Sequence, residues 1–203
     1  MFKKFIAGAL LATLALSALA PVAAAAEPAS KGKPTVDAVT RLVNYSANNN
    51  NQLSTLLTAA TCDYFDGAIA NTLKTAKHTL FAPRNAAFRD LGVALGLGDA
   101  GINASNVCKV DEVLKVDGAL ATILTYHVYA EGKVGFDKAK SLRGASVEML
   151  SKEKAKIGGQ QRNVVKIAGA KVVVKNIRSA NAVTHVVNKV MVPPTIKAAL
   201  AAK

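Results

Sequence analysis

The segment TLFAPRNAAF, residues 79–88, changes within a few positions from a strand pattern to a helix pattern. Residues 78–83, HTLFAP, predict a short strand that ends at Pro83, because proline has no N–H group to donate to a sheet. The aromatic residues Phe81 and Phe88 are expected in the core. Burying each of them contributes roughly 1.5–3 kcal/mol by transfer from water.

The residues that follow, RNAAFRDL (84–91), predict a short helix that ends at Gly92. Asn85 stands at its start, where an amide side chain can cap free backbone N–H groups. Apolar residues at helical spacing predict further helices. These cover residues 35–48 with Thr35 as the cap, a short stretch within 48–61, residues 63–73 and residues 117–126.

Beyond His127 the chain becomes rich in valine, and turn residues divide it into short segments that are typical of strands. The predicted strands cover residues 146–150, 163–168, 171–177 and 182–192. A loop is expected over residues 92–110, and the charged segment 151–163 is expected to form a hairpin loop. Helices first and antiparallel strands later favour the α+β class.

The N-terminus begins with Lys3 and Lys4, followed by an apolar run and then small residues. This arrangement is typical of a secretory signal peptide, with cleavage expected after Ala26. The alternative is an uncleaved anchor, because Phe5–Ala26 is long enough to span a bilayer. We therefore expect a protein that is secreted, either to the periplasm or outside the cell. The expected divisions are a signal peptide (1–26), a polar leader (27–34), one domain (35–196) and a C-terminal tail (197–203).

Two cysteines, Cys62 and Cys108, remain after the predicted cleavage. In an exported protein such a pair favours a structural disulfide over two free thiols. A metal site is disfavoured because neither cysteine belongs to a CxxC pair. Closing a loop of this length stabilises a fold by roughly 4 kcal/mol in the chain-entropy model.

The positive charge of the chain is concentrated in its C-terminal third. Residues 27–132 carry nine Lys and Arg against ten Asp and Glu, whereas residues 133–203 carry fifteen against three. This asymmetry points to an anionic partner, although a solvated, solubilising strand face is the alternative. The residues expected to form a basic face are Lys166, Lys171, Lys175 and Arg178, with Lys152, Lys154, Lys156 and Arg162 in the preceding loop.

Three segments, in order, resemble the fasciclin domain family. Residues 79–88 resemble its first signature, LTYHV (124–128) matches its Tyr-His segment, and ANAVTHVVNKVMVPP (180–194) resembles its second signature. Arg84 and Asn188 depart from the family pattern, where Thr and Asp are usual. The signature positions expected to have structural roles are Phe81, Pro83, Asn85, Phe88, Asn181, His185 and Asn188.

The pair Tyr126–His127 allows three interpretations: a reactive pair, a part of the core, or a contact surface for a partner. Adjacent residues in a strand face opposite ways, and the sequence contains no G-x-S-x-G or H-E-x-x-H motif to support catalysis. A buried histidine needs hydrogen-bond partners, which favours a core role. The resemblance supports the contact interpretation, because this segment is implicated in receptor binding in animal relatives.

The resemblance implies a single fasciclin-like domain, a twisted antiparallel β-sandwich or wedge with helices packed along an edge. It also implies a non-enzymatic adhesion or matrix-interaction module, with no cofactor, metal or catalytic residue. We expect its partner to be a cell-surface or extracellular-matrix component, such as an anionic polysaccharide, bound through the basic strands. The alternatives are extracellular nucleic acid, disfavoured because no aromatic residues interleave with the basic run, and a small ligand, which requires a pocket.

Overall fold

The computed structural model describes residues 34–159 and 163–202 of the 203-residue chain. The predicted signal peptide, nearly all of the leader and Arg162 lie outside the described residues. Within them the helices are α1 (Ala38–Ala47), α2 (Ser54–Ala59), α3 (Ala68–Thr75), α4 (Asn85–Ala94), α5 (Val110–Leu114), α6 (Ala119–Tyr126), α7 (Phe136–Ser141) and α8 (Pro194–Ala201), with short 3₁₀ helices at Asp63–Phe65 and Val107–Lys109. None of these helices is long and apolar enough to cross a lipid bilayer.

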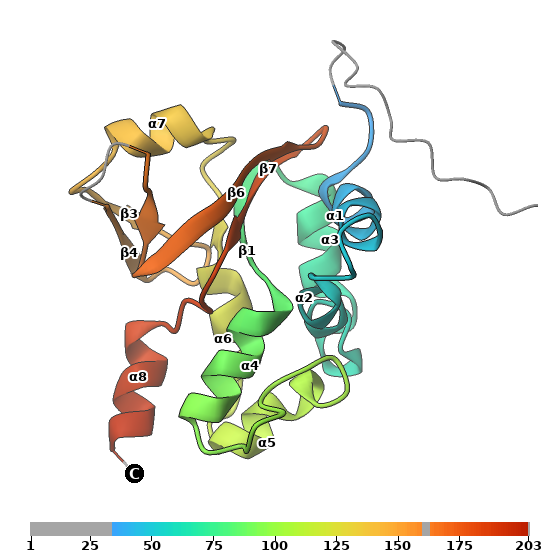
Figure 1. The fold of residues 1–203 in the computed structure, drawn as a ribbon, viewed down its shortest axis with the longest axis vertical. Coiled ribbons are helices and arrows are strands. Elements are labelled where there is room, and N and C mark those ends of the chain that lie inside the picture. Colours follow the sequence, from blue (N-terminus) through green and yellow to red (C-terminus); the bar gives the residue numbers. More distant parts are fainter. Residues whose placement is uncertain (1–33, 160–162, 203) are drawn as a thin grey trace, which may run out of the picture. The chain divides into compact units, whose positions relative to one another are not determined.

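The strands of the described residues form one sheet in the order β2-β1-β7-β6-β5-β4-β3 (Figure 1). They are β1 (His78–Pro83), β2 (Val128–Tyr129), β3 (Ser146–Glu148), β4 (Lys154–Gly158), β5 (Lys166–Ile167), β6 (Ala170–Arg178) and β7 (Ala182–Val187). The sheet folds over, because the Leu150 amide, just after β3, donates to the Val128 carbonyl oxygen in β2 over 2.7 Å. This arrangement confirms the predicted α+β class and the wedge.

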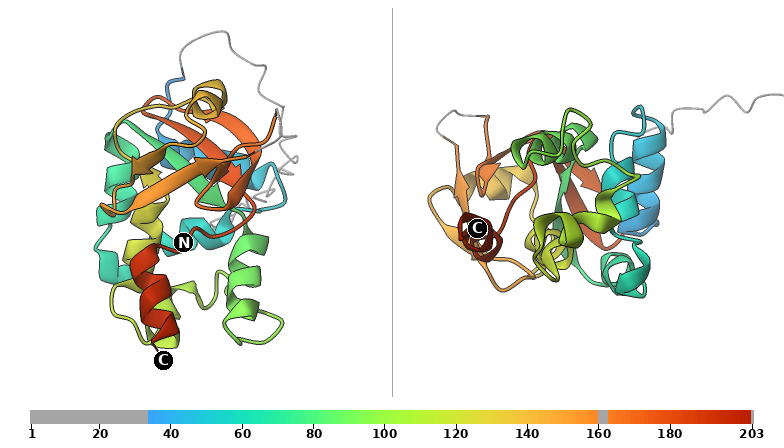
Figure 2. Two further views of the ribbon diagram at one scale, coloured as in Figure 1. Left: turned by 90° about the vertical axis from the view of Figure 1, so that its left-hand side faces the viewer. Right: turned by 90° about the horizontal axis from the view of Figure 1, so that it is seen from below.

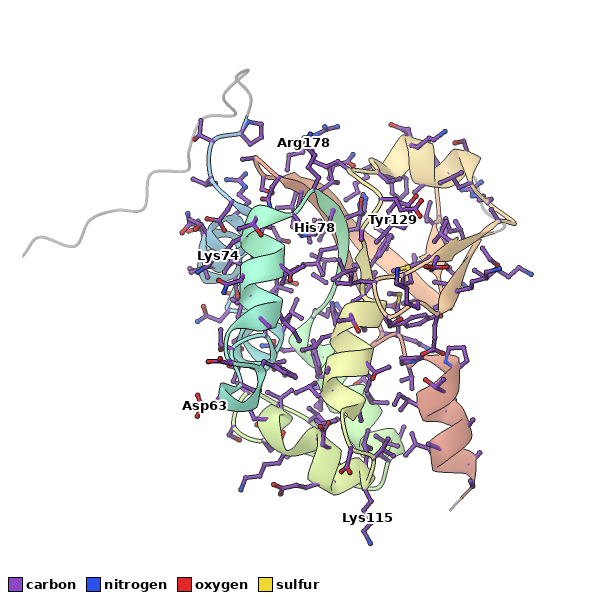
Figure 3. The ribbon with its side chains drawn as sticks, turned by 180° about the vertical axis from the view of Figure 1, so that it is seen from behind. Asp63, Lys74, His78, Lys115, Tyr129 and Arg178 are labelled. Carbon is purple, nitrogen blue, oxygen red and sulfur yellow. A yellow bond between two sulfur atoms is a disulfide. The ribbon has the colours of Figure 1, made fainter. Side chains whose placement is uncertain are left out.

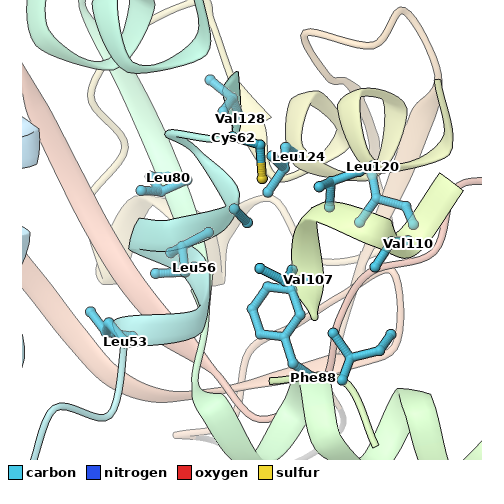
Figure 4. Packing of buried hydrophobic residues seen from close by; sticks show 14 of the residues in the cluster. Leu53, Leu56, Cys62, Leu80, Phe88, Val107, Val110, Leu120, Leu124 and Val128 are labelled. Carbon is cyan, nitrogen blue, oxygen red and sulfur yellow. The ribbon is translucent and has the colours of Figure 1, made fainter. Parts of the chain in front are cut away.

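The central pair of strands, β1 and β7, is parallel and buried along its whole length. Strand alternation sends neighbouring side chains to opposite faces. Leu80 and Val186 therefore face the larger core, which lies under helices α1–α6 and α8 (Figure 4). Phe81 and Val187 face a second core that β4, β5 and α7 help to enclose. The expectation of purely antiparallel pairing was wrong for these two strands.

Other expectations also need correction. The segment predicted as a charged hairpin loop contains β4, where the buried residues Ala155 and Ile157 alternate with the exposed residues Lys154 and Lys156. Helices α5, α7 and α8 were not predicted, and the second 3₁₀ helix lies in the segment expected to be a loop. α8 lies beside α6 (Figures 1 and 2, with Figure 2 showing α8 in dark red), and it crosses the predicted boundary between domain and tail. Because Ile196 is buried and Leu200 packs against the larger core, residues of the predicted tail belong to the domain.

Helix boundaries differ from the expectations at several places. The helix predicted over residues 63–73 is a 3₁₀ helix at Asp63–Phe65 followed by α3. The side chain of Asp37, not Thr35, caps α1 by accepting a hydrogen bond from the Thr40 amide over 3.0 Å. Helix α4 continues through Gly92 instead of ending there. Gly92 has a packing role, because a Cβ at this position would overlap the backbone nitrogen of Ile102. The loop after α4 thus packs directly against the helix backbone.

The predicted disulfide between Cys62 and Cys108 is present, with the two Cα atoms 5.6 Å apart. Cys62 is 3% exposed and belongs to the larger core, where it lies near Leu124 and Val128 (Figure 4). The bond joins the start of the first 3₁₀ helix to the second, across 46 residues of sequence. It therefore closes a chain segment that includes β1 and α4.

Removing this disulfide should destabilise the domain substantially. We expect the double variant Cys62→Ser/Cys108→Ser to lose about 4 kcal/mol of unfolding free energy, because the unfolded chain regains the entropy of the open loop. Urea denaturation followed by circular dichroism measures this loss. The wild-type chain treated with a reductant should unfold at the midpoint of the double variant. Equal midpoints for the oxidised and reduced wild type would contradict the prediction.

Candidate functional site

The Tyr126–His127 pair lies in the interior, at the end of α6. Tyr126 is 2% exposed and His127 is fully buried. The Tyr126 hydroxyl donates to the carbonyl oxygen of Lys154 in β4 over 2.9 Å. Burial, with the charge of Glu153, raises the pKa of Tyr126. These contacts match the core-organising role and place neither side chain where a partner in solution could reach it.

His127 links α6 to the segment between β7 and α8. Its Nε2 atom accepts a hydrogen bond from the Met191 amide over 2.9 Å. The other ring nitrogen, Nδ1, therefore carries the proton and donates to the Ile123 carbonyl oxygen, 2.7 Å away. Both nitrogens are thus engaged by backbone groups, so the imidazole has no lone pair left to act as a base.

His185 packs against Phe81 and Phe136 of the second core. It lies opposite Phe81 in the parallel register, and the two rings stack with their centroids 5.8 Å apart. Nδ1 accepts from the Asn176 amide over 3.3 Å, and Nε2 donates to the Val134 carbonyl oxygen over 2.9 Å. Mainly because of burial, the pKa values of both His185 and His78 are lowered.

The signature asparagines connect segments that are far apart in sequence. Asn181 accepts a hydrogen bond from the Ala38 amide at the start of α1, over 2.9 Å. Its amide nitrogen donates to the carbonyl oxygens of Leu73 and Ala76, at the end of α3, over 2.8 and 2.9 Å. Asn188, directly after β7, accepts a hydrogen bond from the Lys171 amide over 2.8 Å. The residue that stands where the family pattern has Asp therefore still provides a hydrogen-bond acceptor.

Asn85 caps a different helix from the one predicted. It is the first residue of α4, but its side-chain oxygen accepts from the Thr55 amide in the first turn of α2, over 3.0 Å. Its amide nitrogen donates to the Asn51 carbonyl oxygen and the Ser54 hydroxyl, each over 2.9 Å. Sequence reasoning identified the right residue and the right chemistry, but not the partner.

The predicted basic face divides into two groups. We call Lys154, Lys156, Lys166 and Lys171 the strand lysines; all four are exposed, on β4, β5 and β6. Lys166 and Lys171 are directly opposite each other in the β5–β6 register. Between Lys171 and Arg178 the β6–β7 pairing has two irregularities, which change the direction of the strand's side chains.

Of the other predicted residues that the structure describes, Lys152 pairs with Glu148, whereas Lys175 and Arg178 lie near α7. The Lys175 ammonium is 5.0 Å from the centroid of the Phe136 ring, and Lys140 approaches the same ring at 5.6 Å. Arg178 is at the end of β6 (Figure 3), close enough to Gly135 that its guanidinium would be 3.9 Å from an added Cβ. These two cations therefore form a second basic group, next to the start of α7.

The carboxylates of the C-terminal third, which we call the basic third, each contact a lysine or a threonine of the same third. Residues 133–203 contain three acidic residues. Asp137 pairs with Lys140 at 2.7 Å, and Glu148 pairs with Lys152 at 3.5 Å. Glu153 accepts from the amide and hydroxyl of Thr195 at the start of α8, over 3.0 and 2.7 Å. The described residues contain no group of three or more His, Cys, Asp or Glu that could hold a metal ion.

His127 makes stability depend on pH in a defined direction. Burial lowers the pKa of His127 to about 4 from its ordinary value of 6.5. The folded state thus favours the neutral ring, and the resulting stability is present above pH 6.5 and is lost as the pH falls through 4. For this one residue the loss is about 3 kcal/mol.

We expect His127→Gln, which cannot titrate, to show a flatter dependence of unfolding free energy on pH between 6.5 and 4 than the wild type. His78 and His185 remain in both proteins, so the difference between the two curves isolates His127. Urea unfolding at several pH values measures it. Parallel curves would show that His127 is not held neutral by the core.

Comparison with known proteins agrees with this geometry. The model of the Fasciclin domain matches residues 51–193. Immunogenic protein MPB70 of Mycobacterium bovis is 31% identical over 159 residues, which cover 75% of this chain and 69% of that protein. The cell surface glycolipoprotein MPB83 of the same species is 31% identical over 151 residues, covering 73% of this chain and 59% of MPB83.

A solved structure shows the same fold. The FAS1 domain pair of the insect cell adhesion molecule Fasciclin I superposes with a TM-score of 0.57 at 10% sequence identity. The match covers 80% of this chain and 53% of that chain, so this chain spans about half the length of the domain pair. From its signature segments, its fold and these relatives, this chain belongs to the fasciclin domain family.

Proposed function

We propose that this chain is an exported, non-enzymatic adhesion module that binds an anionic polymer of the cell surface or extracellular matrix through the strand lysines. The observation that carries the proposal is the direct opposition of Lys166 and Lys171 in neighbouring strands. Like charges in this position destabilise a sheet, by roughly 0.2–1 kcal/mol. A surface that is used for binding can retain such a cost, because function and stability trade against each other.

The surroundings of the strand lysines favour a negatively charged partner. The acidic residues of the same third of the chain are held by Lys140, Lys152 and Thr195. Lys154 lies opposite Glu148, but Lys156 lies opposite Ser146, and Lys166 lies opposite Gly158 and Lys171. The strand registers therefore bring a carboxylate to Lys154 and none to Lys156 or Lys166. An external anion can supply the negative charge that no cross-strand carboxylate provides to these lysines.

The spacing of the strand lysines suits a polymer more than a single small anion. They occupy three adjacent strands, and neighbouring strands are about 4.8 Å apart, so the row spans about 10 Å. Several anionic groups of one polymer molecule can contact such a row of lysines at the same time. The names of the relatives, a cell surface glycolipoprotein and a cell adhesion molecule, support a role at the cell surface.

Retention on immobilised dextran sulfate tests the proposal, with neutral dextran as the reference matrix. We expect the wild type to bind dextran sulfate and to elute as salt rises, because exposed charges are screened. The triple variant Lys156→Gln/Lys166→Gln/Lys171→Gln should lower the slope of log binding constant against log salt by about three, roughly one for each lysine lost.

The matched control removes three exposed lysines outside the basic third: Lys74→Gln/Lys77→Gln/Lys109→Gln. It changes the net charge equally, and Lys74 lies on α3, away from α7 and β4 (Figure 3). This control should bind nearly as well as the wild type. If both triple variants lose binding equally, net charge and not the strand lysines governs retention, and the proposal fails.

A single substitution tests separately how the lysine pair affects the stability of the sheet and how it affects binding of the polymer. Lys171→Gln should raise the unfolding free energy by roughly 0.2–1 kcal/mol while weakening binding to dextran sulfate, because it removes the cross-strand repulsion. Lys156→Gln, opposite Ser146, removes no such repulsion and should leave stability unchanged. Chemical denaturation of the three proteins measures this, and a destabilised Lys171→Gln would contradict the account.

A further inference from the structure

An apolar slot of about 210 Å³ lies between α3 and α6. The two helices are adjacent on the side of the molecule that faces the viewer in Figure 3, and β2 and the segment after β3 complete the slot. Its lining consists of aliphatic residues and two threonines. The lining residues are Ala68, Ile69, Thr72, Leu73, Leu124, Thr125, Val128 and Leu150.

The slot has a buried floor and an open mouth. Leu73, Leu124 and Val128 are buried, whereas Ala68 is exposed and Thr72 is half-buried. The mouth therefore lies along the first turns of α3. Apolar side chains that form a concave surface without a partner are typical of a ligand pocket.

The polar atoms of the lining are already hydrogen-bonded within the protein. The Thr72 hydroxyl donates to the Ala68 carbonyl oxygen over 3.0 Å, and the Thr125 hydroxyl donates to that of Ala121 over 2.7 Å. At the floor, the Leu150 amide donates to the Val128 carbonyl oxygen. A water molecule needs two to four polar partners to be held in a cavity, so the slot is poorly suited to water.

We propose that the slot binds the end of a single aliphatic chain, as in a medium-chain fatty acid or alcohol. No lining residue carries a charge, which matches an uncharged hydrocarbon end. An apolar cavity of about 150 Å³ is known to hold benzene, so by proportion this slot accepts about eight carbon atoms. The polar head of the ligand remains outside, at the mouth beside α3.

The size of the slot predicts how binding depends on chain length. Each methylene that enters an apolar site tightens binding about fourfold. We expect the dissociation constant to fall about fourfold per methylene up to about eight carbons and then to level off, because additional methylenes stay in water. Methyl NMR of the full chain, titrated below the micelle concentration with n-alkanols and n-alkanoates of six to twelve carbons, measures this.

The titration also locates the ligand. Shifts should concentrate on the methyl groups of Leu73, Leu124 and Val128, which form the floor. Equal dissociation constants for alkanol and alkanoate would assign the affinity to the hydrocarbon alone. Tighter binding of the alkanoate would show that a cation at the mouth adds to it, and both results keep the hydrocarbon site.

Two threonines of α3 provide a matched pair of variants. The hydroxyls of Thr72 and Thr75 each donate to the carbonyl oxygen four residues earlier, over 3.0 and 2.9 Å. Only Thr72 lines the slot. Thr72→Phe should fill the mouth and weaken binding at least tenfold, whereas Thr75→Phe should bind as the wild type does. Ala68→Phe is a second filling variant in case Thr72→Phe unfolds.

Several outcomes would overturn the proposal. These are affinity that keeps rising through twelve carbons, shifts spread over the surface, equal binding by the two phenylalanine variants, or no saturable binding at all. The strand lysines take no part in the slot, so Thr72→Phe should still bind dextran sulfate. If the slot binds no aliphatic chain, the proposed polymer binding is therefore unaffected. If the polymer binding fails, the slot proposal is equally unaffected.

Discussion

The parallel pairing of β1 and β7 is the constraint on which the rest of the domain depends. All residues of both strands are buried, which is usual for parallel strands because both of their faces need covering. The two faces support separate cores, one under the helices and one inside the folded sheet. Parallel strands cannot be joined by a tight turn, so the chain must travel from Pro83 to Ala182 before the pair can form.

Polar side chains from the signature segments, half-buried at Asn85 and Asn181 and buried at His127, hold this long connection in place. Most helices here are short and lack a side-chain cap from their own N-terminus. Asn85 and Asn181 supply hydrogen bonds to the ends of α2, α1 and α3 from elsewhere in the chain. His127 does the same between α6 and Met191. These residues therefore serve the fold, whereas the recognition that we propose uses the exposed lysines and the apolar slot.

Local patterns in the sequence predicted most elements, and the cysteine pair predicted the disulfide, whereas the other long-range relations were missed. The predicted strands that contain Phe81 and His185 are present. Their parallel pairing could not be predicted, because it depends on the topology of the whole chain. Strand β4 was missed because its lysines suggested a loop, although Ala155 and Ile157 alternate with them as a half-buried strand requires. The predicted basic residues of β6, which are Lys171, Lys175 and Arg178, could not be divided by sequence, since strand irregularities after Lys171 set their directions. Four separate segments build the apolar slot, so no local pattern reveals it.

The central claim is that recognition belongs to the exposed strands while the Tyr126–His127 segment belongs to the core. Hydrogen–deuterium exchange with and without dextran sulfate tests it most directly. The account predicts slower amide exchange in β4, β5 and β6 on binding, with exchange at Tyr126, His127 and Met191 unchanged. Protection confined to the Tyr126–His127 segment, with none in the lysine-bearing strands, would contradict it.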